Sequence, residues 1–371
     1  MRCVKFIFLL LFSIAGFAQT VPLSDNARIS VLTCDVGNEV YSLFGHTAIR
    51  ITDPATGIDV VYNYGMFDFD TPNFVAKFAK GDLQYFVAVN NYQDFIYQYV
   101  AEQRSVYEQV LNLTSTQKQQ LFDRLNTVLA SDEKYYTYKF IDRNCTNMAV
   151  DVINEVLGQD AIVKTDNTDI TYRSVLYPYF NGHFYEQLGT SIIFGTKVDQ
   201  KATLLFLPGE FMNSLEVTKI NGKPIAEKKE ILLEYKTPES NGTWWNNIYT
   251  YIALLLVVAI ANKRPLTYIY FTILGLIGCF FSIAGAYSLH EELAYNYNVL
   301  LLNPWLLVII YLQITKRQLW LNRVAVAAIA MIAVYFIIML NKIHLFIVLP
   351  MILVNLYLLG RIYRSSKQSK K

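Results

Sequence analysis

The chain has few of the residues that build metal centres and few of the charges that bind nucleic acid. Its 371 residues include only four cysteines and four histidines, and no segment is repeated. No pair of histidines or cysteines in the polar N-terminal part has the spacing of zinc ligands, so no metal site is expected. The formal net charge is only +2, and no basic stretch is interleaved with aromatic residues. The sequence therefore does not indicate nucleic acid as a partner.

Apolar residues, in contrast, are abundant. Hydrophobic residues make up 53% and aromatic residues 15% of the chain, which is more than one ordinary soluble domain contains. The first 18 residues, MRCVKFIFLLLFSIAGFA, combine two basic residues, an apolar run and small residues at the end. This order is typical of a cleaved secretory signal peptide. An uncleaved N-terminal anchor is the alternative, although the run is shorter than the ~20 residues that span a bilayer.

A globular region is predicted at 19–243, and five apolar runs follow it. Each run is close to the length of a membrane-spanning helix; they cover 244–261, 266–287, 299–315, 319–340 and 343–360, ahead of a basic tail at 361–371. Lysine and arginine collect between alternate runs and in the tail, whereas Lys342 is the only one in the other turns. Because such residues gather on the cytoplasmic side, the sequence predicts a multi-pass protein of the cytoplasmic membrane with a cytoplasmic C-terminus.

The globular region has the pattern of an α+β domain. Strands are expected at 28–34, 46–52, 58–64 and 83–89, with DPATG as the hairpin turn between the second and the third. Helices are expected from Thr71 to Gly81, from Tyr92 to Gln103 and after the capping box TSTQ.

One cysteine stands at a predicted helix start, in KFIDRNCTNMAVDVINEVLG. Asn144 is a good N-cap, and apolar residues recur on one helix face as far as Gly158. The free N–H groups and the dipole at this end lower the pKa of a thiol, so Cys145 is a candidate nucleophile, and the same N–H groups are candidates for holding an oxyanion. His46, at a loop-to-strand boundary in YSLFGHTAIRI, is the candidate base.

Other interpretations of these residues stay open. Exported proteins commonly oxidise their cysteines, so a disulfide between Cys34 and Cys145 is an alternative, although Cys34 also suits a buried thiol in an apolar strand. His183 has no cysteine or acidic cluster beside it and is expected to be a surface or packing residue. Three residues near the histidine strand are candidates for orienting His46, and each is equally an ordinary sheet residue: Arg50, Asn63 and Tyr64.

The two boxes resemble those of known thiol enzymes. FGHTAIRI followed by RNCTNM is similar to the circularly permuted branch of papain-like enzymes related to the NlpC peptidases. More closely, the chain from about 28 to 360 resembles the Lnb family of bacterial lipoprotein N-acyltransferases, through LTC, FGHTAIR, YNYGMFDFD, NCTN and HEELAYNYNVLLLNP. The resemblance implies a permuted papain-like (NlpC-like) domain in the periplasm, followed by an all-α bundle of five transmembrane helices.

The resemblance also implies a reaction. Cys145 would take an acyl chain from a membrane phospholipid as a thioester and pass it to the α-amine of a diacylglyceryl-cysteine lipoprotein, with His46 as the base and without a cofactor. A cell-wall amidase or peptidase and a lipid hydrolase would use the same pair with water as acceptor. A non-catalytic assembly or sensing protein would use neither residue.

Further candidates for positioning groups or for substrate contacts are Asn144 beside the nucleophile, His290, Asn296 and Asn298 in the turn HEELAYNYN, and Asn303 inside an apolar run. For the turn, an ordinary polar loop is the alternative. For Asn303, the alternative is that it satisfies the backbone around the following proline.

Overall fold

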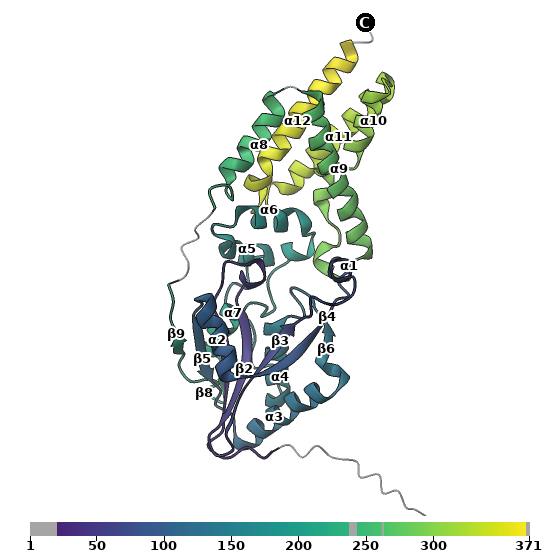
Figure 1. Ribbon diagram of the computed structural model, residues 1–371. Helices are drawn as coiled ribbons and strands as arrows, with labels where there is room; N and C mark the ends of the chain where they lie inside the picture. The colour runs from purple at the N-terminus through teal and green to yellow at the C-terminus, as the bar shows by residue number, and fades with distance from the viewer. Residues whose placement is uncertain (1–20, 237–242, 262, 369–371) are drawn as a thin grey trace, which may run out of the picture.

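The computed structural model describes residues 21–236, 243–261 and 263–368. The predicted signal peptide at 1–18 lies outside these residues. The described chain forms a sheet domain at the N-terminal side and a bundle of apolar helices at the C-terminal side (Figure 1). The predicted α+β class is therefore confirmed.

A seven-stranded antiparallel sheet organises the first domain. Its strand order is β6-β4-β3-β2-β1-β5-β9. The strands are β1 (Arg28–Cys34), β2 (His46–Asp53), β3 (Ile58–Met66), β4 (Gln84–Asn91), β5 (Val106–Val110), β6 (Tyr135–Thr137) and β9 (Glu230–Leu233), and β7 (Lys219–Ile220) pairs with β8 (Lys223–Pro224) apart from them. The four strands expected from the sequence are β1 to β4.

Helices cover both faces of this sheet, because the strand residues alternate between them. Ile49 and Ile51 of β2 pack into a core with α3 (Ser115–Ala130), α4 (Cys145–Leu157) and α7 (Pro208–Val217), whereas Ala48 packs with α2 (Tyr92–Glu102) on the other face. Three further helices are α1 (Phe74–Lys80), α5 (Tyr172–Leu176) and α6 (Phe184–Ile193). Short 3₁₀ helices occur at Val40–Ser42, Asp132–Lys134, Tyr177–Phe180 and Lys197–Asp199.

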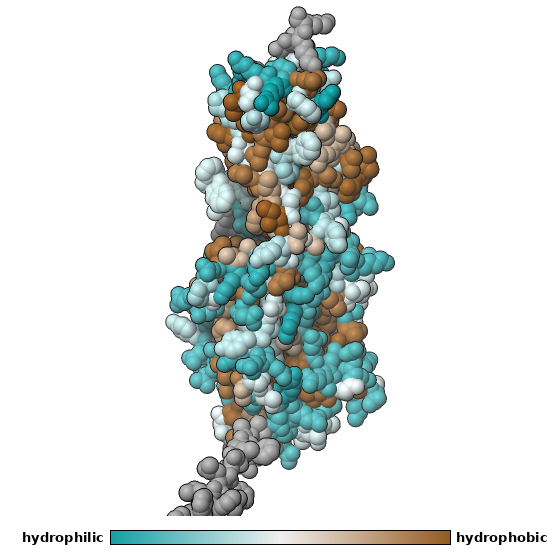
Figure 2. Space-filling view, turned by 90° about the vertical axis from the view of Figure 1, so that its right-hand side faces the viewer, coloured by the Kyte–Doolittle hydropathy of each residue, from teal (hydrophilic) through white to brown (hydrophobic). Residues whose placement is uncertain are grey.

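The C-terminal bundle contains α8 (Ile248–Ile260), α9 (Arg264–Tyr287), α10 (Trp305–Ile314), α11 (Gln318–Met339) and α12 (Leu345–Gln368). By length and composition, four helical segments are able to cross a membrane: Arg264–Tyr287, Glu291–Ile314, Gln318–Met339 and Leu345–Lys367. Before α10, the second of these contains the 3₁₀ turns Glu291–Leu293 and Tyr297–Leu300. Figure 2 shows hydrophobic side chains around this end of the molecule and hydrophilic ones at its tip.

Two features of the bundle differ from the sequence-based expectation. The first predicted span, 244–261, yields a helix of only 13 residues, about 20 Å long at 1.5 Å per residue, against a hydrocarbon core of about 30 Å. It begins late because the Asn247 side chain caps it, accepting hydrogen bonds from the backbone of Tyr249 and Thr250. In addition, α12 continues through most of the predicted tail at 361–371, where no helix breaker follows Gly360.

Backbone contacts fix the sheet domain to the near ends of these helices. Leu289 N–H donates to the carbonyl of Lys80 at the end of α1 (2.7 Å), and Gly195 N–H donates to the carbonyl of Glu292 (2.7 Å). The second contact needs a glycine, because a Cβ at Gly195 would lie 1.9 Å from the carbonyl oxygen of Ala294. The two parts of the chain are therefore joined tightly at this junction.

Candidate active site

The α4 helix starts at Cys145 because Asn144, which precedes it, and Asn147 in the first turn form a capping box. The Asn144 side chain accepts from the N–H groups of Thr146 (2.8 Å) and Asn147 (3.1 Å), and Asn147 Oδ1 accepts from Asn144 N–H (3.1 Å). The amide nitrogen of Asn144 donates to the carbonyls of Phe140 and Phe206, so the cap itself is anchored. The predicted role of Asn144 as N-cap is confirmed.

Capping leaves one donor at this helix start unused. Among the described residues, the backbone N–H of Cys145 has no acceptor, whereas the two N–H groups that follow it bond to Asn144. A free N–H on the nucleophile's own residue, at the positive end of a helix dipole, is suited to an oxyanion.

His46 is the first residue of β2 and faces the N-terminal end of α4. Gly45 before it has φ 78°, and a Cβ there would lie 2.6 Å from the carbonyl oxygen of Cys34. Glycine is thus required for the chain to enter β2 so close to β1. A hydroxyl contact between Thr47 of β2 and Thr146 of α4 (3.0 Å) fixes the strand against the helix.

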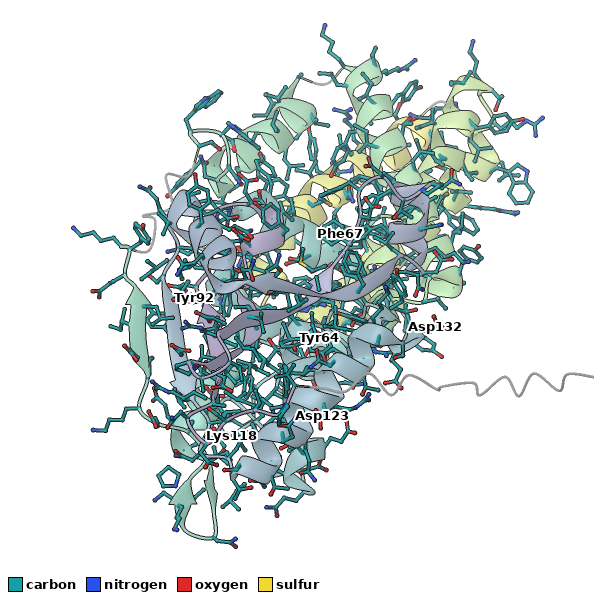
Figure 3. All side chains as sticks on the ribbon, turned by 60° about the horizontal axis from the view of Figure 1, so that its bottom comes forward. Tyr64, Phe67, Tyr92, Lys118, Asp123 and Asp132 are labelled. Atoms are coloured by element: carbon teal, nitrogen blue, oxygen red, sulfur yellow. The ribbon has the colours of Figure 1, made fainter. Side chains whose placement is uncertain are left out.

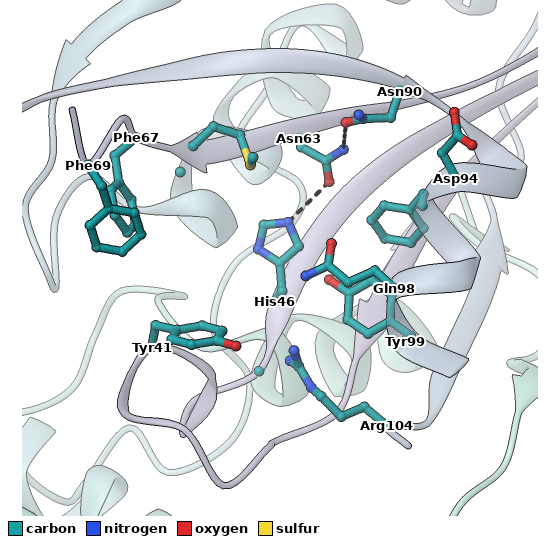
Figure 4. Close-up of a pocket in the computed structure, with 14 residues that line it drawn as sticks. Tyr41, His46, Asn63, Phe67, Phe69, Asn90, Asp94, Gln98, Tyr99 and Arg104 are labelled. Atoms are coloured by element: carbon teal, nitrogen blue, oxygen red, sulfur yellow. Dashed lines mark hydrogen bonds between the residues drawn. The ribbon is translucent and has the colours of Figure 1, made fainter. Parts of the chain in front are cut away.

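A short chain of side chains sets the tautomer of His46. Its Nε2 lies 3.2 Å from Asn63 Oδ1 on β3, and Asn63 Nδ2 donates to Asn90 Oδ1 on β4 (2.9 Å). Because Asn63 uses its NH₂ group toward Asn90, its oxygen faces the imidazole, and Nε2 must carry the proton. The other ring nitrogen, Nδ1, is then free to accept the proton of a thiol. Figure 4 shows this arrangement.

The thiol of Cys145 and the imidazole of His46 lie near enough to shift the pKa of one another. Burial raises the pKa of Cys145, but the His46 charge and hydrogen bond and the Thr47 N–H outweigh it, and the net pKa is lowered. Burial lowers the pKa of His46, but Cys145 and Asn63 outweigh it, and the net pKa is raised. Both shifts favour a thiolate next to an imidazolium, the reactive form of such a pair.

Cys34 is not bonded to Cys145. Both are free cysteines, so the alternative of a disulfide between them is not what the structure shows. Cys34 lies opposite His46 in the β1–β2 pairing and is fully buried, and this burial raises its pKa to about 12. Its thiol is therefore inert at neutral pH, in contrast to Cys145.

A cavity of about 480 Å³ opens beside His46. Its lining includes Asn63 and Gly65 of β3, and a Cβ at Gly65 would lie 3.7 Å from Cβ of Cys145. In Figure 4, Phe67 and Phe69 lie on one side of the imidazole, and Gln98 and Tyr99 of α2 lie on the other. The remaining lining residues are Tyr41, Met66, Asn90, Asp94, Phe95 and Arg104, with Gly45. The cavity thus offers an apolar wall and several polar groups next to His46, and Cys145 lies behind the lining residue Gly65.

Of the three residues considered for orienting His46, only Asn63 contacts it. Arg50 binds Asp59 (2.8 Å) and Glu108 (3.3 Å) and stacks on a tyrosine of α2, further along β2. Tyr64 points to the opposite sheet face and packs in the core with α3 and α4 (Figure 3). The sequence did not distinguish Asn63 from Tyr64, because neighbouring residues of a strand point to opposite faces of the sheet and the sequence did not show which face carries His46.

The candidates in the turn HEELAYNYN lie at the domain junction, away from this cavity. His290 Nε2 is 2.9 Å from the carbonyl of Phe78, and the amide of Asn296 donates to two carbonyls at the end of α6. Asn298 donates to carbonyls of the same region. Asn303 lies further along, in the bundle, where its side-chain oxygen accepts from Trp305 N–H (2.9 Å) at the start of α10. These are structural bonds, and any contact of these side chains with substrate stays a prediction.

His183 and two residues of the cavity complete the comparison with the sequence. His183, expected to be a surface or packing residue, is half-buried at the start of α6, 4.0 Å from Glu186. Asn90 and Arg104 were not among the candidates. The sequence did contain one usable signal for this part of the site, Gly65 within a strand pattern. A glycine inside a strand often marks a bulge or a close approach of another group. The β3–β4 register is indeed shifted between Asn63 and Met66.

The shifted pKa values predict how the thiol reacts with an alkylating reagent. In the intact protein, the alkylation rate of Cys145 should rise with pH around an apparent pKa below that of an ordinary cysteine. His46→Ala removes the charge and hydrogen bond that lower this pKa but leaves the burial that raises it. The apparent pKa should therefore move upward, by roughly one to three pH units. Rates of iodoacetamide labelling between pH 5 and 10, followed by peptide mass spectrometry, measure it.

Cys34→Ala is the matched control for this measurement and should leave the profile unchanged. A His46→Ala profile that coincides with that of the intact protein would contradict the proposed coupling of the two side chains. Labelling of Cys145 only after addition of a reductant would point to a disulfide instead.

The two parts of the chain match two protein-family models. Residues 18–177 match the Lnb N-terminal periplasmic domain, and residues 234–370 match the Lnb transmembrane domain. No curated protein and no solved structure matches the chain. The first match contains β1 to β6 with His46 and Cys145, and the second contains the helix bundle. With both domains present in this order, the protein belongs to the Lnb family, as a membrane protein with a periplasmic N-terminal domain.

Proposed function

We propose that the protein is a lipoprotein N-acyltransferase. It transfers an acyl chain from a membrane phospholipid, through a thioester on Cys145, to the α-amine of a diacylglyceryl-cysteine lipoprotein. The observation that carries this proposal is the Cys145–His46–Asn63 arrangement beside a cavity, in a domain bonded to the ends of apolar helices. A thiol that must reach lipids needs both the activated pair and this position next to the bilayer.

The first step forms the thioester. The thiolate of Cys145 attacks the ester carbonyl of the phospholipid, and the free N–H of Cys145 donates to the resulting oxyanion. When the C–O bond breaks, the His46 imidazolium gives its Nδ1 proton to the leaving alcohol oxygen, which departs as the lysophospholipid. Asn63 holds the imidazole by Nε2 through both states of the ring.

The second step returns the pair to its starting state. The neutral amine of the lipoprotein attacks the thioester carbonyl, and His46 Nδ1 accepts one amine proton as the C–N bond forms. The C–S bond then breaks, which releases the amide product and restores the thiolate and the imidazolium. Water in place of the amine would give a fatty acid, so the choice of acceptor separates a transferase from a lipid hydrolase.

The proposed topology has five crossings, with α8 as the short first one and the C-terminus in the cytoplasm. Two features support it. The end of α12 lies at the far end of the bundle from the sheet domain (Figure 1). The basic residues between α8 and α9 and between α10 and α11 belong to the turns of that same far end. We also propose the inner membrane as the location and the permuted papain-like arrangement for the periplasmic domain.

Intact mass spectrometry of a lipoprotein tests the function directly. A lipoprotein made in cells that lack their own N-acyltransferase activity should gain the mass of one acyl chain when this protein is present. Co-expression of Cys145→Ala should give the diacylated form only, because no thioester can form. Cys34→Ala, which removes the inert cysteine, should still give the triacylated form. A lipoprotein mass unaffected by the unsubstituted protein would exclude the proposed activity on that lipoprotein.

A further inference from the structure

Arg104 is a buried cation that the Cys–His pair does not require. It lies two residues after the end of α2 and is only 5% exposed. Its Nε donates to the carbonyl of Asp35 (2.9 Å) and its Nη1 to Glu102 (2.7 Å), and the guanidinium packs on the ring of Tyr99. Three of its sides are thus held in place by neighbouring groups.

The remaining nitrogen, Nη2, is buried and has no hydrogen-bond partner among the described residues. Arg104 lines the cavity beside His46, and Figure 4 shows its guanidinium directed into that cavity between Tyr41 and Tyr99. A buried guanidinium donor without a partner is costly, and native structures rarely leave one without a reason. The fixed orientation and the unused donor together indicate a ligand atom that accepts hydrogen bonds.

The charge of Arg104, although paired with Glu102 (2.7 Å), is a minor factor acting against the catalytic pair. A nearby cation lowers the pKa of His46, whereas the thiolate–imidazolium pair needs that pKa raised. An anion on Nη2 would cancel this effect at the moment when substrate is bound. The planar guanidinium matches the oxygens of a phosphate better than an ammonium group does.

We infer that Arg104 binds the phosphate of the acyl donor, so that the cavity takes a glycerophospholipid with its phosphate on Nη2 and its ester next to Cys145. This assignment rests on the proposed function for the role of the lipid. The apolar wall of Phe67 and Phe69 on the other side of His46 suits the lipid part of the same molecule. The ligand class is therefore a lipid phosphodiester rather than a neutral acylglycerol.

Binding rather than turnover tests this assignment. Full-length protein with Cys145→Ala, in detergent, is titrated with didecanoyl phosphatidylglycerol and with didecanoylglycerol, which differ only in the phosphate headgroup. The charged lipid should bind more tightly. The further substitution Arg104→Met should weaken the affinity for didecanoyl phosphatidylglycerol by about 10- to 100-fold, the range for a lost hydrogen bond to a charged group. It should change the affinity for didecanoylglycerol by less than about twofold.

Two further variants guard against a folding defect. Arg124→Met removes another arginine that pairs with carboxylates, in a separate pocket, and should change neither affinity. Arg104→Lys keeps the charge without the planar group and should lose less than Arg104→Met. If Arg104→Met does not fold, the test relies on Arg104→Lys and on the affinities of the two lipids for the Cys145→Ala protein that retains Arg104. Equal affinity of that protein for both lipids overturns the assignment.

The remaining outcomes separate this inference from the proposed function. Equal weakening of both lipids by Arg104→Met would show a structural role and overturn it. If sn-glycerol 3-phosphate binds as tightly as the lipid and with the same dependence on Arg104, the site is one for soluble phosphates, and the lipid assignment fails. The charged lipid could bind more tightly in a way that depends on Arg104, while the unsubstituted protein forms no thioester. That result would support the phosphate site and contradict the acyltransferase proposal.

Discussion

Incubation of the full-length protein with phospholipid, without a lipoprotein acceptor, should add the mass of one fatty acyl chain to the peptide that contains Cys145. The two-step reaction requires this adduct, because the acyl group must wait on sulfur until an amine arrives. Hydroxylamine should remove it, as it cleaves thioesters. Cys145→Ala should show no adduct at all, the largest effect we expect from any single substitution. Peptide mass spectrometry after rapid quenching measures it.

Cys34→Ala is the control, because Cys34 lies close to the pair but is fully buried with a pKa of about 12. It should acquire the adduct on Cys145 as the unsubstituted protein does. A diacylated lipopeptide with a free α-amine should then discharge the thioester, whereas the same lipopeptide blocked at that amine should not. Discharge by water as fast as by the free amine would make the protein a lipid hydrolase.

Loss of His46 should slow formation of this adduct by ~10²–10⁴-fold, the usual contribution of general acid–base catalysis. Asn63→Ala should slow it by less, because the imidazole remains but loses the acceptor that holds its Nε2 proton. The two effects should not add in the double variant, since Asn63 acts only through His46. Initial rates of thioester formation, compared across the four proteins, measure both effects.

Asn126→Ala is a matched control for the amide substitution. Asn126 accepts a hydrogen bond from the hydroxyl of Tyr62 (3.0 Å) on the opposite face of the sheet. Its removal should leave the rate unchanged within about twofold. If Asn126→Ala slows the reaction as much as Asn63→Ala does, the effect of Asn63 is one of general stability and not of histidine orientation.

Local signals in the sequence were sufficient for the elements that carry the pair. The α4 start depends on residues within three positions of Asn144, and the strand at His46 depends on its own alternation. Asn63 and Arg104 depend on strand pairing instead. Asn63 reaches His46 because it pairs with Ala48, and Arg104 reaches the cavity because Val106 pairs with Cys34. Such registers are set by the whole sheet and not by neighbouring residues.

The membrane part shows a different limit of sequence reasoning. Hydrophobicity located the apolar runs, but it does not show where a helix begins, and the cap at Asn247 shortens α8. Polar residues near apolar runs were interpreted as candidates for substrate contact. The structure shows that Asn298 satisfies carbonyls at Ser191 and Phe194 and accepts from Tyr335, three bonds that join distant segments. A polar residue in an apolar run therefore does not by itself indicate a substrate contact, because it can instead satisfy buried backbone groups.

The bonds of Lys80 with Leu289 and of Gly195 with Glu292 have a kinetic consequence for the proposed reaction. In the proposed reaction they would hold the thiol at a constant height above the ends of the helices, and both lipid substrates would arrive by lateral diffusion within the leaflet. The rate should then follow the mole fraction of each lipid in the surface and not its concentration in the bulk solution. Adding inert detergent at constant total substrate would slow such an enzyme by diluting the surface alone.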